Sequence, residues 1–137
     1  MDMSQQSDPI PLFKIPWTDD DIRTVTESIK RGGYWAKGPY VDQFESKLEE
    51  FLNVNNALVV NSGTTALVAA LQGLEIGEGD EVIVPAFTFI ATANAVRLVG
   101  AEPIFADIES NTYGLDPASV EDNLSESTAA IIPVHPY

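Results

Sequence analysis

From residue 57 onward the chain alternates short apolar runs with segments of helical periodicity, and this alternation restricts the fold more than any other feature of its 137 residues. The apolar runs have the length of strands and occupy residues 57–60, 81–85, 103–108 and 129–134. Helices are expected between them, at about 64–74, 88–99 and 116–125. Strands that are apolar on both faces are typical of parallel sheets covered by helices. The predicted fold class is therefore α/β, with a three-layer, largely parallel sheet flanked by helices.

The N-terminal part of the chain has a different pattern. Residues 1–17 are interrupted by prolines and predict an irregular lead-in, while residues 18–56 predict two helices and residues 57–137 form the alternating β/α part. The first helix should begin at Thr18, whose hydroxyl can cap it ahead of three aspartates, and should end at Gly32. The second helix is amphipathic and places one apolar stripe on its surface: Val41, Phe44, Leu48, Phe51 and Leu52.

Charge and composition restrict the possible partners. The chain has 21 acidic and 7 basic residues, a formal net charge of −14, and no Lys or Arg after Arg97. Such a surface repels a phosphate backbone, so we expect no nucleic-acid partner. There is no cysteine and no apolar run long enough to span a membrane, and the first residues lack the pattern of a signal peptide. A cytoplasmic location without membrane contact is the expectation.

The turn at residues 61–65, Asn-Ser-Gly-Thr-Thr, joins the first predicted strand to an apolar helix rich in Ala and Leu. A helix start leaves free backbone N–H groups, which bind an anion such as phosphate without any Lys or Arg. The turn lacks the glycine pattern of dinucleotide sites and the Gly-Lys-Ser/Thr of nucleotide triphosphatases, so a single phosphate group suits it better than a pyrophosphate. A helix that is merely well capped is an equally good interpretation of the turn alone.

The next unit repeats this arrangement, with a strand at 81–85, a short turn and a helix of small residues. We expect Phe89 on the first turn of that helix. If the strands 57–60 and 81–85 are neighbours, their carboxyl ends share one crevice, and Phe89 could lie flat against a planar ring whose phosphate sits at 62–65. The alternative for Phe89 is a core aromatic, and for Phe87 a core aromatic is the preferred interpretation. A phosphate site beside an aromatic side chain suggests an aromatic phosphate cofactor.

The chain resembles the DegT/StrS-type nucleotide-sugar aminotransferases, which use pyridoxal phosphate and have the aspartate-aminotransferase fold. The resemblance runs nearly from end to end and is strongest at 79–95, which begins Gly-Asp-Glu-Val-Ile-Val-Pro. The other matching segments are 38–39, 44–45, 61–64, 100–103, 107–108, 112–113 and 132–135. It implies that the chain is the N-terminal part of the large domain of a fold type I enzyme.

The resemblance also implies roles for particular residues. Gly63 and Thr64 would hold the cofactor phosphate, mainly through backbone N–H groups, with a further contribution from Ser62, and Phe89 would stack on the pyridine ring. The implied substrate is a nucleotide-linked keto-sugar, the implied amino donor is commonly glutamate, and the family acts as homodimers whose sites lie near the subunit interface. No metal is implied.

One family feature is missing from this chain. The family needs a lysine that forms a Schiff base with the cofactor and an acid that keeps the pyridine nitrogen protonated; both would lie beyond Tyr137. All four lysines precede the predicted sheet: Lys14, Lys30, Lys37 and Lys47. We therefore expect no catalytic residue within the chain. Because the chain stops three residues after its last apolar run, which should lie inside a sheet, we expect it to be an N-terminal fragment.

Several alternatives stay open at this point. A sugar dehydratase of the same family would carry a histidine in place of the lysine, and a non-enzymatic α/β module would bind a phosphorylated ligand without any need for an aldehyde. A scaffold or degenerate remnant is a third possibility. His135 is the only histidine, and a structural role is preferred for it. Tyr34 and Trp35 could reach a substrate or a partner subunit or simply anchor their loop, and Asp107 with Glu109 is best interpreted as a solvated turn.

Overall fold

The computed structural model describes residues 10–33 and 38–136. The chain divides into two compact units, Met1–Gln43 and Phe44–Tyr137. None of the described helices is long and apolar enough to cross a membrane. The helices and strands are, in chain order, α1 (Asp19–Arg31), α2 (Pro39–Leu52), α3 (Gly63–Gly73), β1 (Glu81–Pro85), α4 (Ala91–Leu98), β2 (Glu102–Ala106), α5 (Pro117–Asp122) and β3 (Thr128–Ile131).

The first unit contains α1, whose two ends agree with the sequence pattern. The Thr18 hydroxyl accepts a hydrogen bond from the Asp21 N–H at 3.3 Å, and the Asp21 carboxylate accepts one from the Thr18 N–H at 2.7 Å. This reciprocal capping box lowers the pKa of Asp21. Gly32 ends the helix in the left-handed conformation at φ 60°, which glycine adopts without steric cost. The predicted start and end of this helix are confirmed.

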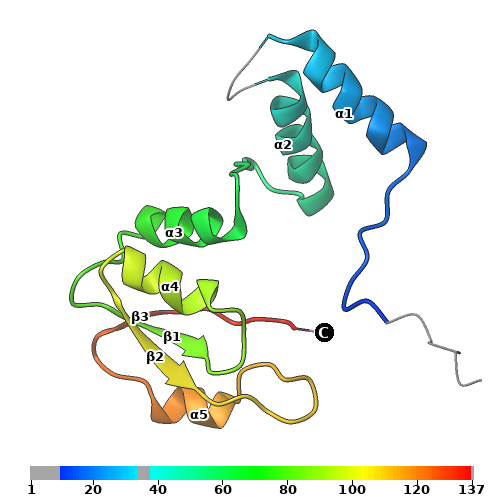
Figure 1. The fold of residues 1–137 in the computed structure, drawn as a ribbon. Coiled ribbons are helices and arrows are strands. Elements are labelled where there is room, and N and C mark those ends of the chain that lie inside the picture. The colour runs from blue at the N-terminus through cyan, green and yellow to red at the C-terminus, as the bar shows by residue number, and fades with distance from the viewer. Residues whose placement is uncertain (1–9, 34–37, 137) are drawn as a thin grey trace, which may run out of the picture. The chain divides into compact units, whose positions relative to one another are not determined.

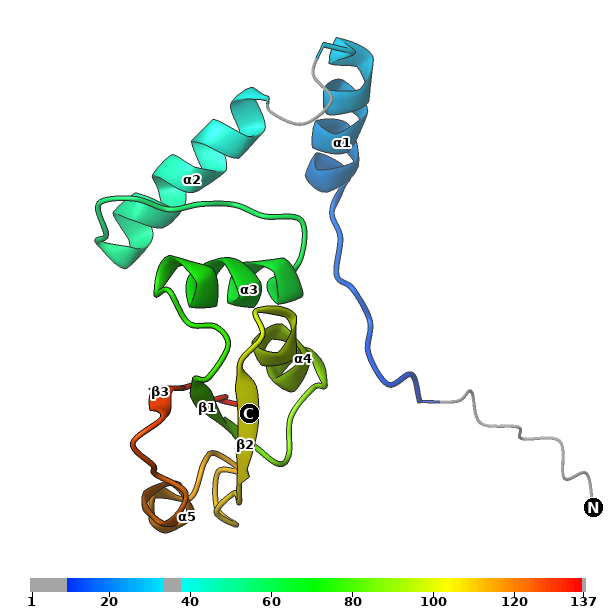
Figure 2. The same cartoon turned by 90° about the vertical axis from the view of Figure 1, so that its left-hand side faces the viewer.

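The second unit is built on a parallel sheet with the strand order β2-β1-β3. The chain passes from β1 through α4 to β2, and then returns through α5 to β3 on the other side of β1. Parallel crossovers are right-handed, so two crossovers that run in opposite directions place their helices on opposite faces of the sheet. Figures 1 and 2 show this arrangement, with α3 and α4 on one side of the strands and α5 on the other. The predicted α/β fold class is confirmed.

The core of this unit lies between β1 and the helix pair α3 and α4. Val82 and Val84 of β1 are fully buried against Leu71 of α3 and Val96 of α4. Ile83 points to the opposite face of the strand and is also fully buried. A strand that is apolar on both faces is thus covered on both faces, as the unbroken Val-Ile-Val run predicts.

The predicted strand at 57–60 is wrong. None of these residues belongs to a strand, and within the described residues their backbone makes no hydrogen bond to another backbone group. The N–H groups of Ala57 and Val59 donate instead to the carboxylates of Glu49 and Glu45 on α2. A strand exists only with a pairing partner, and the three strands of this sheet pair among themselves.

Other boundaries differ by a few residues. The helix predicted at 88–99 begins only at Ala91, so Phe89 precedes it rather than lying on its first turn. The strand predicted at 103–108 is β2, which ends at Ala106, and the helix predicted at 116–125 is the shorter α5. The division of the chain at residue 56 stays a prediction, since the two compact units separate within α2.

Candidate functional site

The order of the strands opens a crevice at the carboxyl ends of β1 and β3. The chain leaves β1 in one direction and returns to β3 on its other side, and ligands of open α/β sheets bind at such a reversal of strand order. A hollow of ≈ 350 Å³ lies there. Its lining follows the ends of these two strands and consists of Phe87, Thr88, Phe89, Val134 and Pro136. The crevice therefore belongs to β1 and β3, and the expected pair formed by strands 57–60 and 81–85 is wrong.

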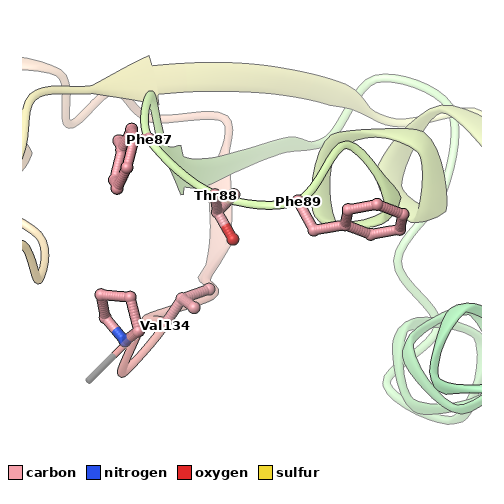
Figure 3. A pocket seen from close by; sticks show the side chains of 5 residues that line it. Phe87, Thr88, Phe89 and Val134 are labelled. Atoms are coloured by element: carbon pink, nitrogen blue, oxygen red, sulfur yellow. The ribbon is translucent and has the colours of Figure 1, made fainter. Parts of the chain in front are cut away.

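The two phenylalanines of this segment lie on different sides of Thr88. Figure 3 shows the Phe87 ring on the same side as Val134, while the Phe89 ring points away from them. Phe87 is 52% exposed and lies 6.1 Å from the Tyr113 ring, centroid to centroid, in a tilted arrangement. The core interpretation of Phe87 is thus wrong. Phe89 is 77% exposed, so it is not a core residue either, and the face of its ring is open to a ligand.

The first turn of α3 carries unused hydrogen-bond donors. Ser62 caps the helix by accepting from the Thr65 N–H at 3.1 Å. The Thr65 hydroxyl donates to Asn61 at 3.0 Å, so the 2.9 Å contact between the Ser62 and Thr65 hydroxyls is donated by Ser62. Within the described residues, the N–H groups of Gly63 and Thr64 have no partner. These two amides are the donors available to a ligand, whereas the Ser62 hydroxyl is already engaged.

The helix that carries the free amides and the helix that follows Phe89 lie on the same face of the sheet. α3 and α4 pack against the same face of β1 through Leu71 and Val96, and Phe89 lies just before the start of α4. In Figure 1 both helices begin at the end of the sheet where β1 ends. Because the N-terminal end of a helix carries partial positive charge, this end of the sheet favours an anion. That Gly63 and Phe89 face a common ligand stays a prediction.

The space beside Gly63 fits a phosphate group. A Cβ atom built on Gly63 meets nothing within 4 Å, and Gly63 is not among the glycines with positive φ. Neither packing nor backbone conformation therefore requires glycine at this position. The backbone is instead open to close approach, which is what a phosphate that binds two amides needs. This donor set fits a phosphate group without any cationic side chain.

The loop after β2 forms one wall beside Phe87. The Glu109 carboxylate accepts hydrogen bonds from the Asn111 N–H at 2.7 Å and the Thr112 N–H at 2.6 Å, and from the Thr112 hydroxyl. The Thr112 hydroxyl, followed by the two backbone amides, lowers the pKa of Glu109. Glu109 thus orders the loop that carries Tyr113. The sequence predicted a solvated turn for Asp107 and Glu109, and the hydrogen bonds of Glu109 give this turn a fixed structure.

Some predicted residues do not reach the site. His135 is exposed and does not line the hollow. Tyr34 and Trp35 lie outside the described residues. Three lining residues were missed by the sequence analysis, namely Thr88, Val134 and Pro136. Their position three to five residues after the carboxyl end of a parallel strand was the available signal, but its use requires the order of the strands.

Comparison with known proteins identifies the family. The sequence profile of the DegT/DnrJ/EryC1/StrS aminotransferase family matches residues 17–137. The chain belongs to this family.

Three relatives show the extent of the similarity. The chain is 44% identical over 116 residues to the spore coat polysaccharide biosynthesis protein SpsC of Bacillus subtilis, covering 85% of this chain and 30% of that protein. It is 36% identical over 128 residues to the GDP-perosamine synthase of Vibrio cholerae, and the match covers 93% of this chain and 35% of that protein. The crystal structure of NtdA from Bacillus subtilis with bound cofactor PMP matches with a TM-score of 0.80 at 39% identity. The match covers 88% of this chain and 28% of NtdA. The chain thus spans about a third of the length of these relatives.

The Glu109 hydrogen bonds predict a pH-dependent loss of stability. The pKa of Glu109 in the folded protein lies below its ordinary value of 4.5. The contribution of Glu109 to the free energy of unfolding is therefore present above pH 4.5 and is lost as the pH falls below that value. In Glu109→Ala, the urea unfolding midpoint should therefore fall less between neutral and acidic pH than it does in the unmodified protein. Glu126→Ala is the control, since the Glu126 carboxylate makes no hydrogen bond within the described residues. An unchanged pH profile in Glu109→Ala would contradict this role.

Proposed function

We propose that this chain supplies the phosphate site and ring platform of a pyridoxal-phosphate-dependent aminotransferase that acts on a nucleotide-linked keto-sugar. The observation that carries the proposal is the pair of free amides at Gly63 and Thr64, at the start of α3. This helix lies on the same face of the sheet as α4, and the exposed Phe89 comes just before α4 in the chain. Family membership and the similarity to a structure with bound cofactor PMP support it.

Each residue of the site has a distinct task in this proposal. The amides of Gly63 and Thr64 donate to the cofactor phosphate, and the N-terminal end of α3 stabilises its charge. Ser62 acts through the cap, because its hydroxyl holds the first turn of α3 in place rather than facing the ligand. Phe89 provides an apolar surface that orients the pyridine ring. When bound, the cofactor withdraws electrons from the carbon next to the transferred amino group.

The substrate and assembly are proposed from the relatives. One relative is a GDP-perosamine synthase and another is a UDP-2-acetamido-2-deoxy-3-oxo-D-glucuronate aminotransferase of Pseudomonas aeruginosa, whose names describe nucleotide-linked sugars. We propose a substrate of that class, with glutamate as the amino donor and a cytoplasmic homodimer as the working form. The lysine that binds the cofactor covalently is proposed to lie in the remainder of a longer protein, since the chain spans about a third of its relatives.

Gly63→Ala tests the phosphate site in the full-length protein. The added Cβ would occupy the open space beside the free amides, so we expect the affinity for pyridoxamine phosphate to fall about tenfold. Affinity for pyridoxamine, which lacks the phosphate, should not change. Because Gly63 has no positive φ, the stability should rise by about 0.4–1 kcal/mol. Fluorescence titration and thermal unfolding measure the two effects.

Gly73→Ala is the matched control for this substitution. Gly73 lies at the other end of α3 and also has open space at its Cβ position. Gly73→Ala should stabilise the protein by a similar amount and leave the affinities for pyridoxamine phosphate and pyridoxamine unchanged. Equal binding of pyridoxamine phosphate and pyridoxamine by the unmodified protein would contradict the proposed phosphate site. Phosphate-dependent binding that ignores the pyridine ring would favour a non-enzymatic module.

Phe89→Leu tests the ring platform. Loss of aromatic stacking is worth about 0.5–1.5 kcal/mol, so affinity should fall up to about tenfold. The effect should be equal for pyridoxamine phosphate and pyridoxamine, because the ring rather than the phosphate is affected. Phe105→Leu, which alters another exposed phenylalanine on β2, is the control. Unchanged binding in Phe89→Leu would remove Phe89 from the site.

A further inference from the structure

Residues 57–60, which lead into the turn at 61–65, are held by two carboxylates of α2. The Val59 N–H donates to Glu45 Oε1 at 2.9 Å, and the Ala57 N–H donates to Glu49 Oε1 at 3.0 Å. Both glutamates are half-buried, in contrast to the other acidic residues of the helix. Within the described residues, these are the hydrogen bonds that hold the backbone of 57–60, because this segment makes no backbone–backbone hydrogen bond.

The geometry explains why this pair of glutamates suits the segment. Residues four apart on a helix are separated by about 6 Å along its axis. Alternate residues of an extended chain present their N–H groups on one edge about 6.6 Å apart. Glu45 and Glu49 therefore match Val59 and Ala57, and their carboxylates stand where the carbonyls of a neighbouring strand would be.

The chain continues from this anchored segment directly into the proposed phosphate site. Val59 lies three residues before the cap Ser62 and four before Gly63. The cap fixes the turn to α3, and the two glutamates accept hydrogen bonds from the backbone of 57–60 in the described part of the chain. A carboxylate that accepts from an N–H makes a charge-assisted hydrogen bond, which is stronger than one to a neutral acceptor.

We infer that Glu45 is a positioning residue for the cofactor phosphate site, acting through Val59 on the placement of the Gly63 and Thr64 amides, with Glu49 in support. The inference rests on the proposed function and adds to it a residue that does not contact the cofactor. A purely structural glutamate would stabilise the fold without affecting the preference for a phosphorylated ligand. A positioning residue changes that preference.

The test compares affinities for pyridoxamine phosphate and pyridoxamine in the full-length protein. Glu45→Ala should lower the ratio of the two affinities about tenfold, since misplaced amides weaken only the phosphate contact. Glu45→Gln keeps an acceptor oxygen and should restore most of the ratio. Glu50→Ala, which removes an exposed glutamate with no hydrogen bond to 57–60, should leave the ratio unchanged.

A second variant guards against a folding failure. Glu45→Asp keeps the charge and shortens the side chain by one methylene group, so it withdraws the acceptor from Val59 and should also lower the ratio. If the unmodified protein prefers pyridoxamine phosphate and Glu45→Ala or Glu45→Asp keeps the same ratio of affinities, the inference is overturned and the proposed function stands. If the unmodified protein shows no such preference, the proposed function itself fails.

Discussion

The burial of β1 on both faces is the constraint on which the second unit depends. Val82 and Val84 face the helix pair, and Ile83 faces the other side of the sheet, all fully buried. β1 is also the central strand, with β2 on one edge and β3 on the other, so the strand order reverses around it. The same reversal of strand order opens the crevice at its carboxyl end. Packing and site thus have one origin.

In the proposed site, an acidic chain would bind an anion through backbone geometry rather than side-chain charge. The net charge is −14 and no Lys or Arg follows Arg97, yet the start of α3 leaves two amides free. The nearby carboxylates of Glu45 and Glu49 accept hydrogen bonds from the backbone, which fixes their orientation. A helix N-terminus attracts negative charge over the distance of its first turn, so local dipoles outweigh the diffuse charge of the surface.

The sequence predicts the features that depend on local chemistry. The helix start at Thr18, its end at Gly32 and the strand at 81–85 all follow from residues that are neighbours in the chain. The errors concern features that depend on distant partners. The apolar run 57–60 has the composition of a strand, but its partners are two glutamates of α2.

The aromatic residues show the same limit. Phe87 resembles a core residue by composition, yet it lies at the crevice against Tyr113, which the loop after β2 brings near. The exposure of a side chain at the end of a strand depends on which strands are its neighbours, and that order is not a local property. Thr88, Val134 and Pro136 were missed for this reason.

A crystal structure of the full-length protein with pyridoxamine phosphate tests the central claim most directly. Phosphate oxygens should lie about 2.7–3.2 Å from the backbone nitrogens of Gly63 and Thr64, with the pyridine ring against Phe89. A phosphate bound away from the first turn of α3, with both amides still free, would contradict the account.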